Sequence, residues 1–89
     1  MRELSRTTQF KKDLELVKKR GKNLKKLIDI VDKLVESKPI PERNKAHHLV
    51  GDMAPLWECH IEPDWLLIWD EDENEVILVR TGSHSDLFG

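Results

Sequence analysis

The stretch WECHIEPDWLLIWDEDENEVILVR, residues 57–80, decides the fold. In its first six residues, Trp57, Cys59 and Ile61 alternate with polar side chains, which is the period of a strand with one buried face. Two nearly continuous apolar runs follow, WLLIW and VILVR, as expected for strands inside a sheet. A proline and the acidic turn DEDENE separate the three segments. We therefore predict an antiparallel meander of three strands.

Upstream of this meander, apolar side chains recur at helical spacing. Phe10, Leu14 and Val17 fall at i, i+4 and i+7, and two threonines before them offer an N-cap. Gly21 follows a basic last turn, which is typical of a helix C-terminus. A second helix is predicted over residues 24–35, where leucine, isoleucine and valine build a broad apolar face.

The order of these elements defines the fold class. Residues 1–7 alternate weakly and are interpreted as a first strand, and the stretch HHLVG could add a short strand before the meander. We predict an α+β fold of order β-α-α-β-β-β, a small antiparallel sheet with two N-terminal helices packed on one face. The other face would then be free to carry polar groups.

Composition excludes several classes of protein. No apolar run approaches the roughly 18 residues that a membrane span needs. Cys59 is the only cysteine, which rules out an internal disulfide framework and suits a reducing cytosol. We therefore expect a cytoplasmic protein with one domain over residues 1–89.

Charge is divided unevenly along the chain, whose formal net charge is −2. Residues 1–45 hold 14 of the 15 lysines and arginines, whereas residues 46–89 hold 10 of the 17 acidic residues. A basic first half suits a phosphate backbone. The same charges could also serve only to solvate exposed helix faces.

Polar side chains that can carry chemistry gather in the second half. All four histidines lie there, and Arg80 is the only lysine or arginine. Antiparallel pairing can bring His60, on the polar face of one strand, close to the end of the last strand, where Arg80 and His84 lie. On spacing alone, three interpretations stay open: acid–base chemistry, a metal site, and ordinary polar surface. The adjacent pair His47–His48 is a poor chelate for zinc.

Histidine, carboxylate and arginine together suit RNA cleavage by the RNA's own 2′-hydroxyl. A general base removes the 2′ proton, a general acid protonates the 5′ leaving oxygen, and a cation stabilises the charge on the phosphate. Histidine titrates near neutrality and can therefore fill either proton-transfer role, each worth about 10²- to 10⁴-fold in rate. No metal or other cofactor is required.

Three motifs resemble those of a known family. KAHHLVG, WECHIEPDWLLIW and VRTGSHSDLFG, in this order behind two basic helices, resemble the YafQ branch of the RelE/ParE toxin superfamily. The resemblance covers nearly the whole chain. It implies a toxin of a type II toxin–antitoxin pair, an mRNA endoribonuclease that enters the ribosomal A site and cuts the message there.

The resemblance also implies a site. His84 is the expected proton donor, and His60 or His47 the expected general base. Asp64 or Glu58 would orient that base. Two further residues complete the site, the first to bind the scissile phosphate and the second to stack on or support a substrate base: Arg80 and Phe88.

The expected partners follow from the same resemblance. They are a cognate antitoxin, mRNA and the ribosome, with operator DNA bound only through the antitoxin complex. Two features depart from the family: the chain is mildly acidic, and the segment GDMAPLWE lacks the basic residues common there. Two alternatives remain, a non-catalytic gyrase inhibitor like the ParE branch and a metal-binding interaction domain. A gyrase inhibitor has no need of His84 or of His60 with Asp64.

Overall fold

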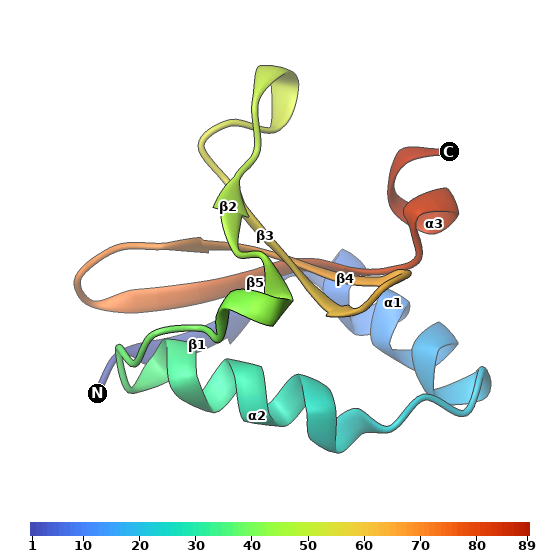
Figure 1. The fold of residues 1–89 in the computed structure, drawn as a ribbon, viewed down its shortest axis with the longest axis horizontal. Helices are drawn as coiled ribbons and strands as arrows, with labels where there is room; N and C mark the ends of the chain where they lie inside the picture. Colours follow the sequence, from blue (N-terminus) through green and yellow to red (C-terminus); the bar gives the residue numbers. More distant parts are fainter.

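The computed structural model describes residues 1–89, and its elements follow the predicted order with additions. Two longer helices precede a meander, and short elements join or extend these parts (Figure 1). The elements in chain order are β1 (Glu3–Arg6), α1 (Thr8–Lys19), α2 (Leu24–Val35), the 3-10 turn η1 (Glu42–Asn44), β2 (His47–His48), the 3-10 turn η2 (Gly51–Met53), β3 (Trp57–Glu62), β4 (Trp65–Glu71), β5 (Glu75–Gly82) and α3 (His84–Phe88). No helix is long and apolar enough to cross a membrane.

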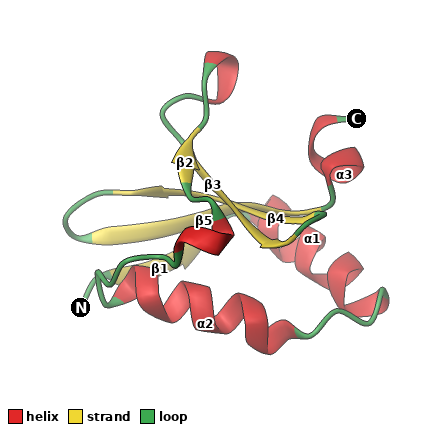
Figure 2. Cartoon of the chain, in the orientation of Figure 1, coloured by secondary structure: helices red, strands yellow, loops and turns green.

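The strands form one sheet of five in the order β1-β5-β4-β3-β2 (Figure 2). The meander β3-β4-β5 is antiparallel, as predicted, and β2 adds an antiparallel edge. The first strand differs, because β1 pairs parallel to β5 and makes the sheet mixed. A strand that is followed by two helices before the chain returns can join the sheet in this direction. The α+β class and the two-helix layer are confirmed.

Helix α1 begins where the sequence predicts. Thr7 is the N-cap, and its hydroxyl accepts a hydrogen bond from the Phe10 backbone N–H. Such a cap stabilises a helix by about 1 kcal/mol. The same hydroxyl donates to the Val79 carbonyl at 2.8 Å, so the cap also ties the start of α1 to β5. Gly21, at φ +77°, opens the loop to α2 in a conformation that other residues rarely adopt.

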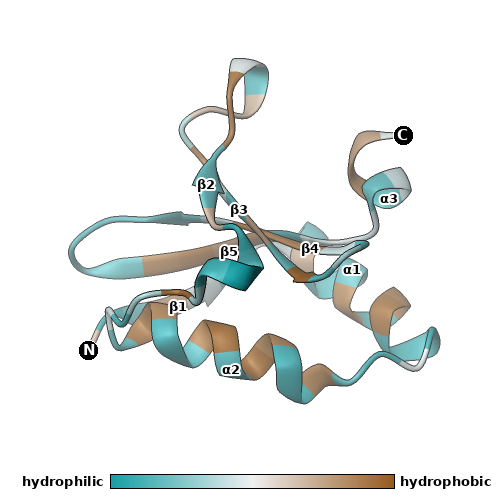
Figure 3. Cartoon of the chain, viewed as in Figure 1, coloured by the Kyte–Doolittle hydropathy of each residue, from teal (hydrophilic) through white to brown (hydrophobic).

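The core lies between the two helices and one face of the sheet. In Figure 1, α1 and α2 lie on one side of the sheet, while α3 and the loop between β2 and β3 stand on the other. Brown, apolar bands on the helices and on the central strands in Figure 3 mark the layers that meet. Cys59 is fully buried among them, and burial raises the pKa of its thiol to about 12.

The face away from the helices is less polar than predicted. Leu66 and Ile68 on β4 lie there by alternation with the core residues Leu67 and Trp69, and both are fully buried. Polar groups therefore flank an apolar centre instead of covering the face.

The C-terminal segment also departs from the expected strand end. The last strand runs two residues beyond Arg80, to Gly82, and the tail forms the short helix α3. Ser83 caps this helix, accepting from the Asp86 N–H, while the Asp86 carboxylate accepts from the Ser83 N–H. This reciprocal pair is a capping box, and it orders a segment that sequence position alone would leave as a tail.

Candidate active site

Strand register brings several of the predicted residues into line across the sheet. His47, Glu58, Ile68 and Arg80 form one row across β2, β3, β4 and β5. The row spans three strand spacings of about 4.8 Å each, so His47 and Arg80 lie at its two ends. The neighbouring row runs from His60 through Leu66 to Gly82.

His84 and Asp64 meet at one end of the sheet. Asp64 lies in the turn before β4, and His84 begins α3 just after β5. Because Leu66 on β4 pairs with Gly82 on β5, Asp64 and His84 lie at the same end of the sheet. Asp64 Oδ1 accepts two hydrogen bonds from His84, at 2.9 Å from the backbone N–H and 2.6 Å from ring Nδ1. The imidazole is exposed, and its Nε2 has no partner in the protein.

The Asp64 carboxyl is held ionised by this contact. The backbone N–H of His84, and then its side chain, lower the pKa of Asp64 below the ordinary value. A carboxylate can only accept, so His84 Nδ1 must carry the hydrogen of this bond. Nε2 is consequently the nitrogen that faces outward and is free to exchange a proton with a bound molecule.

His60 lies beside this pair. Its ring centroid is 5.7 Å from that of His84. His60 Nδ1 approaches the Pro63 carbonyl at 3.4 Å, the limit of a hydrogen bond, and Nε2 has no protein partner. Two imidazoles, each with an Nε2 that has no partner in the protein, therefore lie next to each other at the end of the sheet.

His47 is engaged on both ring nitrogens. Nδ1 lies 2.7 Å from the Lys45 carbonyl, and Nε2 lies 3.3 Å from Glu58 Oε1. Glu58 is only 6% exposed, and it lies opposite His47 where β3 pairs with β2. Of the two carboxylates predicted to orient a base, Glu58 contacts His47 and Asp64 contacts His84.

Arg80 forms an ion pair with an acidic residue that the sequence analysis did not single out. Asp13 on α1 is 7% exposed, and it accepts from Arg80 Nε at 2.7 Å and from Arg80 NH2 at 3.2 Å. Gln9 and the Thr81 backbone N–H also donate to it. Burial opposes ionisation of Asp13, but these hydrogen bonds outweigh it and lower its pKa, while the bond to Asp13 raises the pKa of Arg80.

A signal for Asp13 exists in the sequence. It stands on the apolar stripe of α1, three residues after Phe10 and four before Val17, where an acid is out of place. A buried acid requires a partner. Arg80, the only cation in the second half, is a natural candidate for that partner.

A second ion pair holds α3 against α1. Arg20 NH2 donates to Asp86 Oδ1 at 2.9 Å, and NH1 donates to Oδ2, in the two-pronged geometry that suits guanidinium and carboxylate. Arg20 and the capping box lower the pKa of Asp86 far below its ordinary value. Gly82 allows this approach: at φ +152°, a Cβ there would lie 2.8 Å from Asp86 Oδ2.

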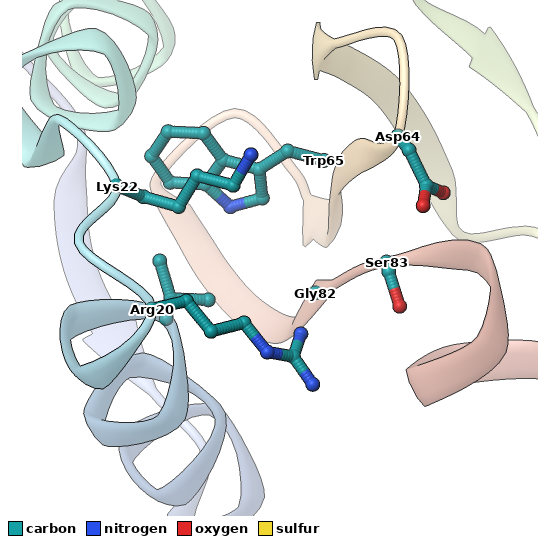
Figure 4. A pocket seen from close by; sticks show the side chains of 7 residues that line it. Arg20, Lys22, Asp64, Trp65, Gly82 and Ser83 are labelled. Atoms are coloured by element: carbon teal, nitrogen blue, oxygen red, sulfur yellow. The ribbon is translucent and has the colours of Figure 1, made fainter.

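A cavity of about 310 Å³ opens between the end of α1 and the start of α3 (Figure 4). In the figure, the Arg20 guanidinium reaches toward Gly82 and Ser83, and Lys22 extends over the Trp65 ring. Asp64 lies on its rim, so the cavity adjoins the His84 pair. The cavity is lined by charged groups and by few apolar ones.

The remaining aromatic and histidine side chains differ in their surroundings. Phe88 is 50% exposed at the end of α3 and is therefore not part of the core. Trp65 and Trp69 are core residues. His48 packs on Trp57, with ring centroids 3.7 Å apart, and its Nδ1 contacts the Pro55 carbonyl.

Comparison with known proteins gives the family. A family model described as the bacterial toxin of type II toxin–antitoxin systems, YafQ, matches residues 2–89. The chain belongs to the YafQ family. The resemblance seen in the motifs is thereby confirmed, and with it the assignment to type II toxins.

Individual YafQ relatives match over nearly their whole length. The mRNA interferase toxin YafQ of Escherichia coli K12 is 35% identical, over 99% of this chain and 97% of that protein. The E. coli DinJ-YafQ toxin-antitoxin complex superposes at a TM-score of 0.91 with 35% identity, over 99% and 98%. A metal-bound toxin from Helicobacter pylori superposes at 0.92 with 39% identity, over 99% and 100%.

Proposed function

We propose that this YafQ-family toxin is a ribosome-dependent mRNA endoribonuclease that uses acid–base chemistry at His84 and His60. The observation that carries the proposal is the pair of neighbouring imidazoles, His60 half-buried and His84 exposed, the latter anchored through Nδ1 to an ionised carboxylate. The name of the E. coli relative, mRNA interferase, supports the same activity.

His84 is suited to be the general acid. When its imidazole is protonated, Asp64 stabilises the cation through Nδ1, and Nε2–H points away from the protein. The 5′ oxygen leaves with the electron pair of the P–O5′ bond and takes the Nε2 proton. Because Asp64 also bonds the His84 backbone, ring and main chain are fixed together, which limits the entropy lost when the donor is aligned.

His60 is the better placed of the two base candidates. Each ring nitrogen of His47 already contacts an oxygen of the protein, so neither is free to accept the 2′ proton. His60 has a free Nε2 and only a weak contact at Nδ1. It accepts the 2′ proton as the 2′ oxygen forms its bond to phosphorus, and the products are a 2′,3′-cyclic phosphate and a 5′-hydroxyl.

The acid and the base must act on opposite sides of phosphorus in an in-line displacement. Neighbouring imidazoles at 5.7 Å can flank one phosphate in this way. Arg80 is proposed to bind the non-bridging oxygens. Asp13 occupies one edge of the guanidinium, Nε and NH2, which leaves NH1 for the substrate. His47, held by Glu58, would contact the RNA farther along the sheet.

Phe88 is proposed to stack on a base next to the scissile bond. Half of its surface is exposed on the helix that carries His84. Stacking of a base on an aromatic ring is worth about 1–3 kcal/mol. The sugar-phosphate chain would then be positioned from the same short helix that supplies the general acid.

The proposed partners are a cognate antitoxin, the ribosome with its mRNA, and operator DNA only through the antitoxin complex. The solved DinJ-YafQ complex supports the first of these. Exposed lysines on α1 and α2 offer contacts for ribosomal RNA. An acidic segment that orders on binding could neutralise the same surface.

Metal chemistry is a separate question, because the Helicobacter pylori relative was solved with metal bound. No group of three or more His, Cys, Asp or Glu side chains in this chain is arranged to hold a metal ion. The proposed steps use only imidazoles and a guanidinium. Cleavage should accordingly persist in the presence of a chelator at concentrations that leave ribosomes intact.

The deciding experiment is induction of wild type and of His84→Ala in cells, with growth and mRNA ends followed together. Cuts inside translated frames with wild type, absent with His84→Ala, are the expected result. Growth arrest by both proteins with messages intact would contradict nuclease activity, and a gyrase supercoiling assay would then test the ParE-like alternative.

A further inference from the structure

A basic turn contacts two histidines, His47 and His60, on neighbouring strands of the sheet. The 3-10 turn η1 ends at Lys45, which has the left-handed φ of +51°. Asn44, 8% exposed, donates from Nδ2 to the His60 carbonyl at 2.7 Å. The Lys45 carbonyl in turn accepts from His47 Nδ1.

These contacts tie the end of the turn to β3 and to the ring of His47. A left-handed conformation is uncommon for a residue with a Cβ and persists only where the surroundings hold it. Here the Lys45 N–H bonds to the Glu42 carbonyl at 2.9 Å, while Asn44 ties the turn to β3. The backbone that carries Arg43 and Lys45 therefore keeps a set position relative to His60.

A cavity of about 390 Å³ lies between the turn and the end of β3. Arg43 and Lys45 line one side, and His60 and Glu62 line the other. Arg43 also borders an adjoining hollow of about 250 Å³ that reaches Lys33 on α2. A continuous trough thus begins beside the proposed base and leads away over Arg43.

The charge in this trough is unbalanced. Arg43 and Lys45 are exposed and make no ion pair in the structure. The one acid on the wall of the first cavity, Glu62, is neutralised by Lys22 at 2.8 Å and Lys26 at 2.9 Å, and these lysines lower its pKa. The adjoining hollow is lined by one unpaired acid, Asp29, and by Lys26 and Lys33. Glu42, in the same turn, is exposed and does not line the cavity.

We propose that Arg43 and Lys45 form a subsite for the backbone phosphate of a nucleotide that flanks the scissile bond in single-stranded RNA. The inference rests on the proposed function, because the trough gains its meaning from the neighbouring His60. Two unpaired cations on a rigid turn bind phosphate without first breaking internal ion pairs. The occupant is the message strand, which must pass His60 to be cut.

The test measures RNA binding directly. A fluorescent RNA hexamer that lacks the 2′-hydroxyl at its central nucleotides is titrated with full-length protein across salt concentrations. The Arg43→Gln, Lys45→Gln double variant should bind about tenfold more weakly. Its slope of log K against log salt should be shallower by about 0.7 for each phosphate that the variant no longer neutralises.

The matched control is the Lys11→Gln, Lys25→Gln double variant. It removes the same charge from two exposed, unpaired lysines on α1 and α2, whose proposed contacts are with ribosomal RNA, which this ribosome-free titration does not contain. Its affinity and salt slope should stay close to wild type. Equally weakened binding in both double variants would overturn the inference, because it would reflect net charge alone.

Two further outcomes would also overturn it. One is no measurable binding of the hexamer by wild type. The other is unchanged hexamer binding by the Arg43→Gln, Lys45→Gln variant together with weaker binding to vacant ribosomes, which would assign the pair to ribosomal RNA. The His84→Ala cleavage experiment is independent, so failure of the nuclease proposal would be recognised separately.

Discussion

The carboxylate of Asp13 and the guanidinium of Arg80 form a partly buried, two-point ion pair that joins α1 to the last strand. Asp13 shows 8% of its side-chain surface and Arg80 shows 28%. Asp13 on helix α1 thereby orients Arg80, the one arginine of the proposed catalytic site. Its geometry makes Asp13 a positioning residue with no predicted contact to RNA.

Substitution Asp13→Asn should therefore weaken both fold and cleavage. Loss of the charge leaves Arg80 and the Thr81 N–H poorly paired, at a cost of about 1–3 kcal/mol in the free energy of unfolding. Urea denaturation measures that change. Cleavage should fall further than Gln9→Ala lowers it, since Gln9 supplies only one neutral hydrogen bond to Asp13. Wild-type cleavage by Asp13→Asn would contradict the positioning role.

Asp13 also predicts a dependence of stability on pH. The pKa of its carboxyl in the folded protein lies below 3.8, its ordinary value, so the unfolded chain binds the proton more tightly. Its contribution to stability is present above pH 3.8 and is lost as the pH falls through the folded pKa. Urea midpoints measured from about pH 7 to pH 2 should fall less steeply at the acid end for Asp13→Asn than for wild type. Parallel curves would show that the ion pair is not linked to folding.

Substitution Asp64→Asn should slow catalysis with little effect on RNA affinity. The variant removes the charge that stabilises a protonated His84 and leaves the exposed turn otherwise intact. A decrease in kcat of up to about 100-fold is expected, which is part of the contribution of one proton-transfer group. Single-turnover cleavage measures it. Asp64→Glu serves as the control, because it restores the charge; a defect as large as that of Asp64→Asn would point to geometry instead.

The two base candidates should differ in kind. His60→Ala should lower kcat by at least about 100-fold, because it removes the proposed proton acceptor. His47→Ala should mainly raise KM, since that ring is engaged with Lys45 and Glu58. Steady-state kinetics on the same substrate separates the two effects. The reverse ranking in kcat would move the base to His47.

The Arg20–Asp86 pair should matter for activity more than for global stability. It is exposed to solvent, yet it docks the helix that carries His84. Arg20→Gln should increase hydrogen exchange in residues 83–88 and reduce cleavage, while the unfolding midpoint stays near that of wild type. Lys19→Gln, one position earlier on α1 and without an ion pair, is the matched control. Unchanged exchange in Arg20→Gln would show that the capping box suffices.

Local pattern predicts most of the elements but not how they meet. The alternation around Cys59 and the helical spacing of Phe10 and Val17 are each contained in one segment, so the sequence alone places them. The parallel pairing of β1 with β5 depends on where the chain returns after two helices. Helix α3 is only five residues long, too short for periodicity to reveal.

The site follows the same division. Motifs pointed to the seven predicted residues, and the sheet register explains why His60 and His84 become neighbours. The partner of each histidine could not be predicted, because Asp64 lies one turn away from His60 in sequence and yet contacts His84 across the end of the sheet. Tertiary contacts between α1 and β5, such as the one that Asp13 makes, carry no local signature beyond a misplaced acid.

The single cysteine can report whether the core of a variant remains closed. Cys59 is enclosed on all sides, and its thiol ionises only at strongly alkaline pH, so a thiol reagent can modify it only when the core opens. The rate of labelling therefore measures how often the core opens around Cys59. A variant that is labelled as slowly as wild type but no longer cuts RNA has kept its fold and lost its site. Measuring labelling and cleavage on the same sample therefore distinguishes loss of the fold from loss of the site.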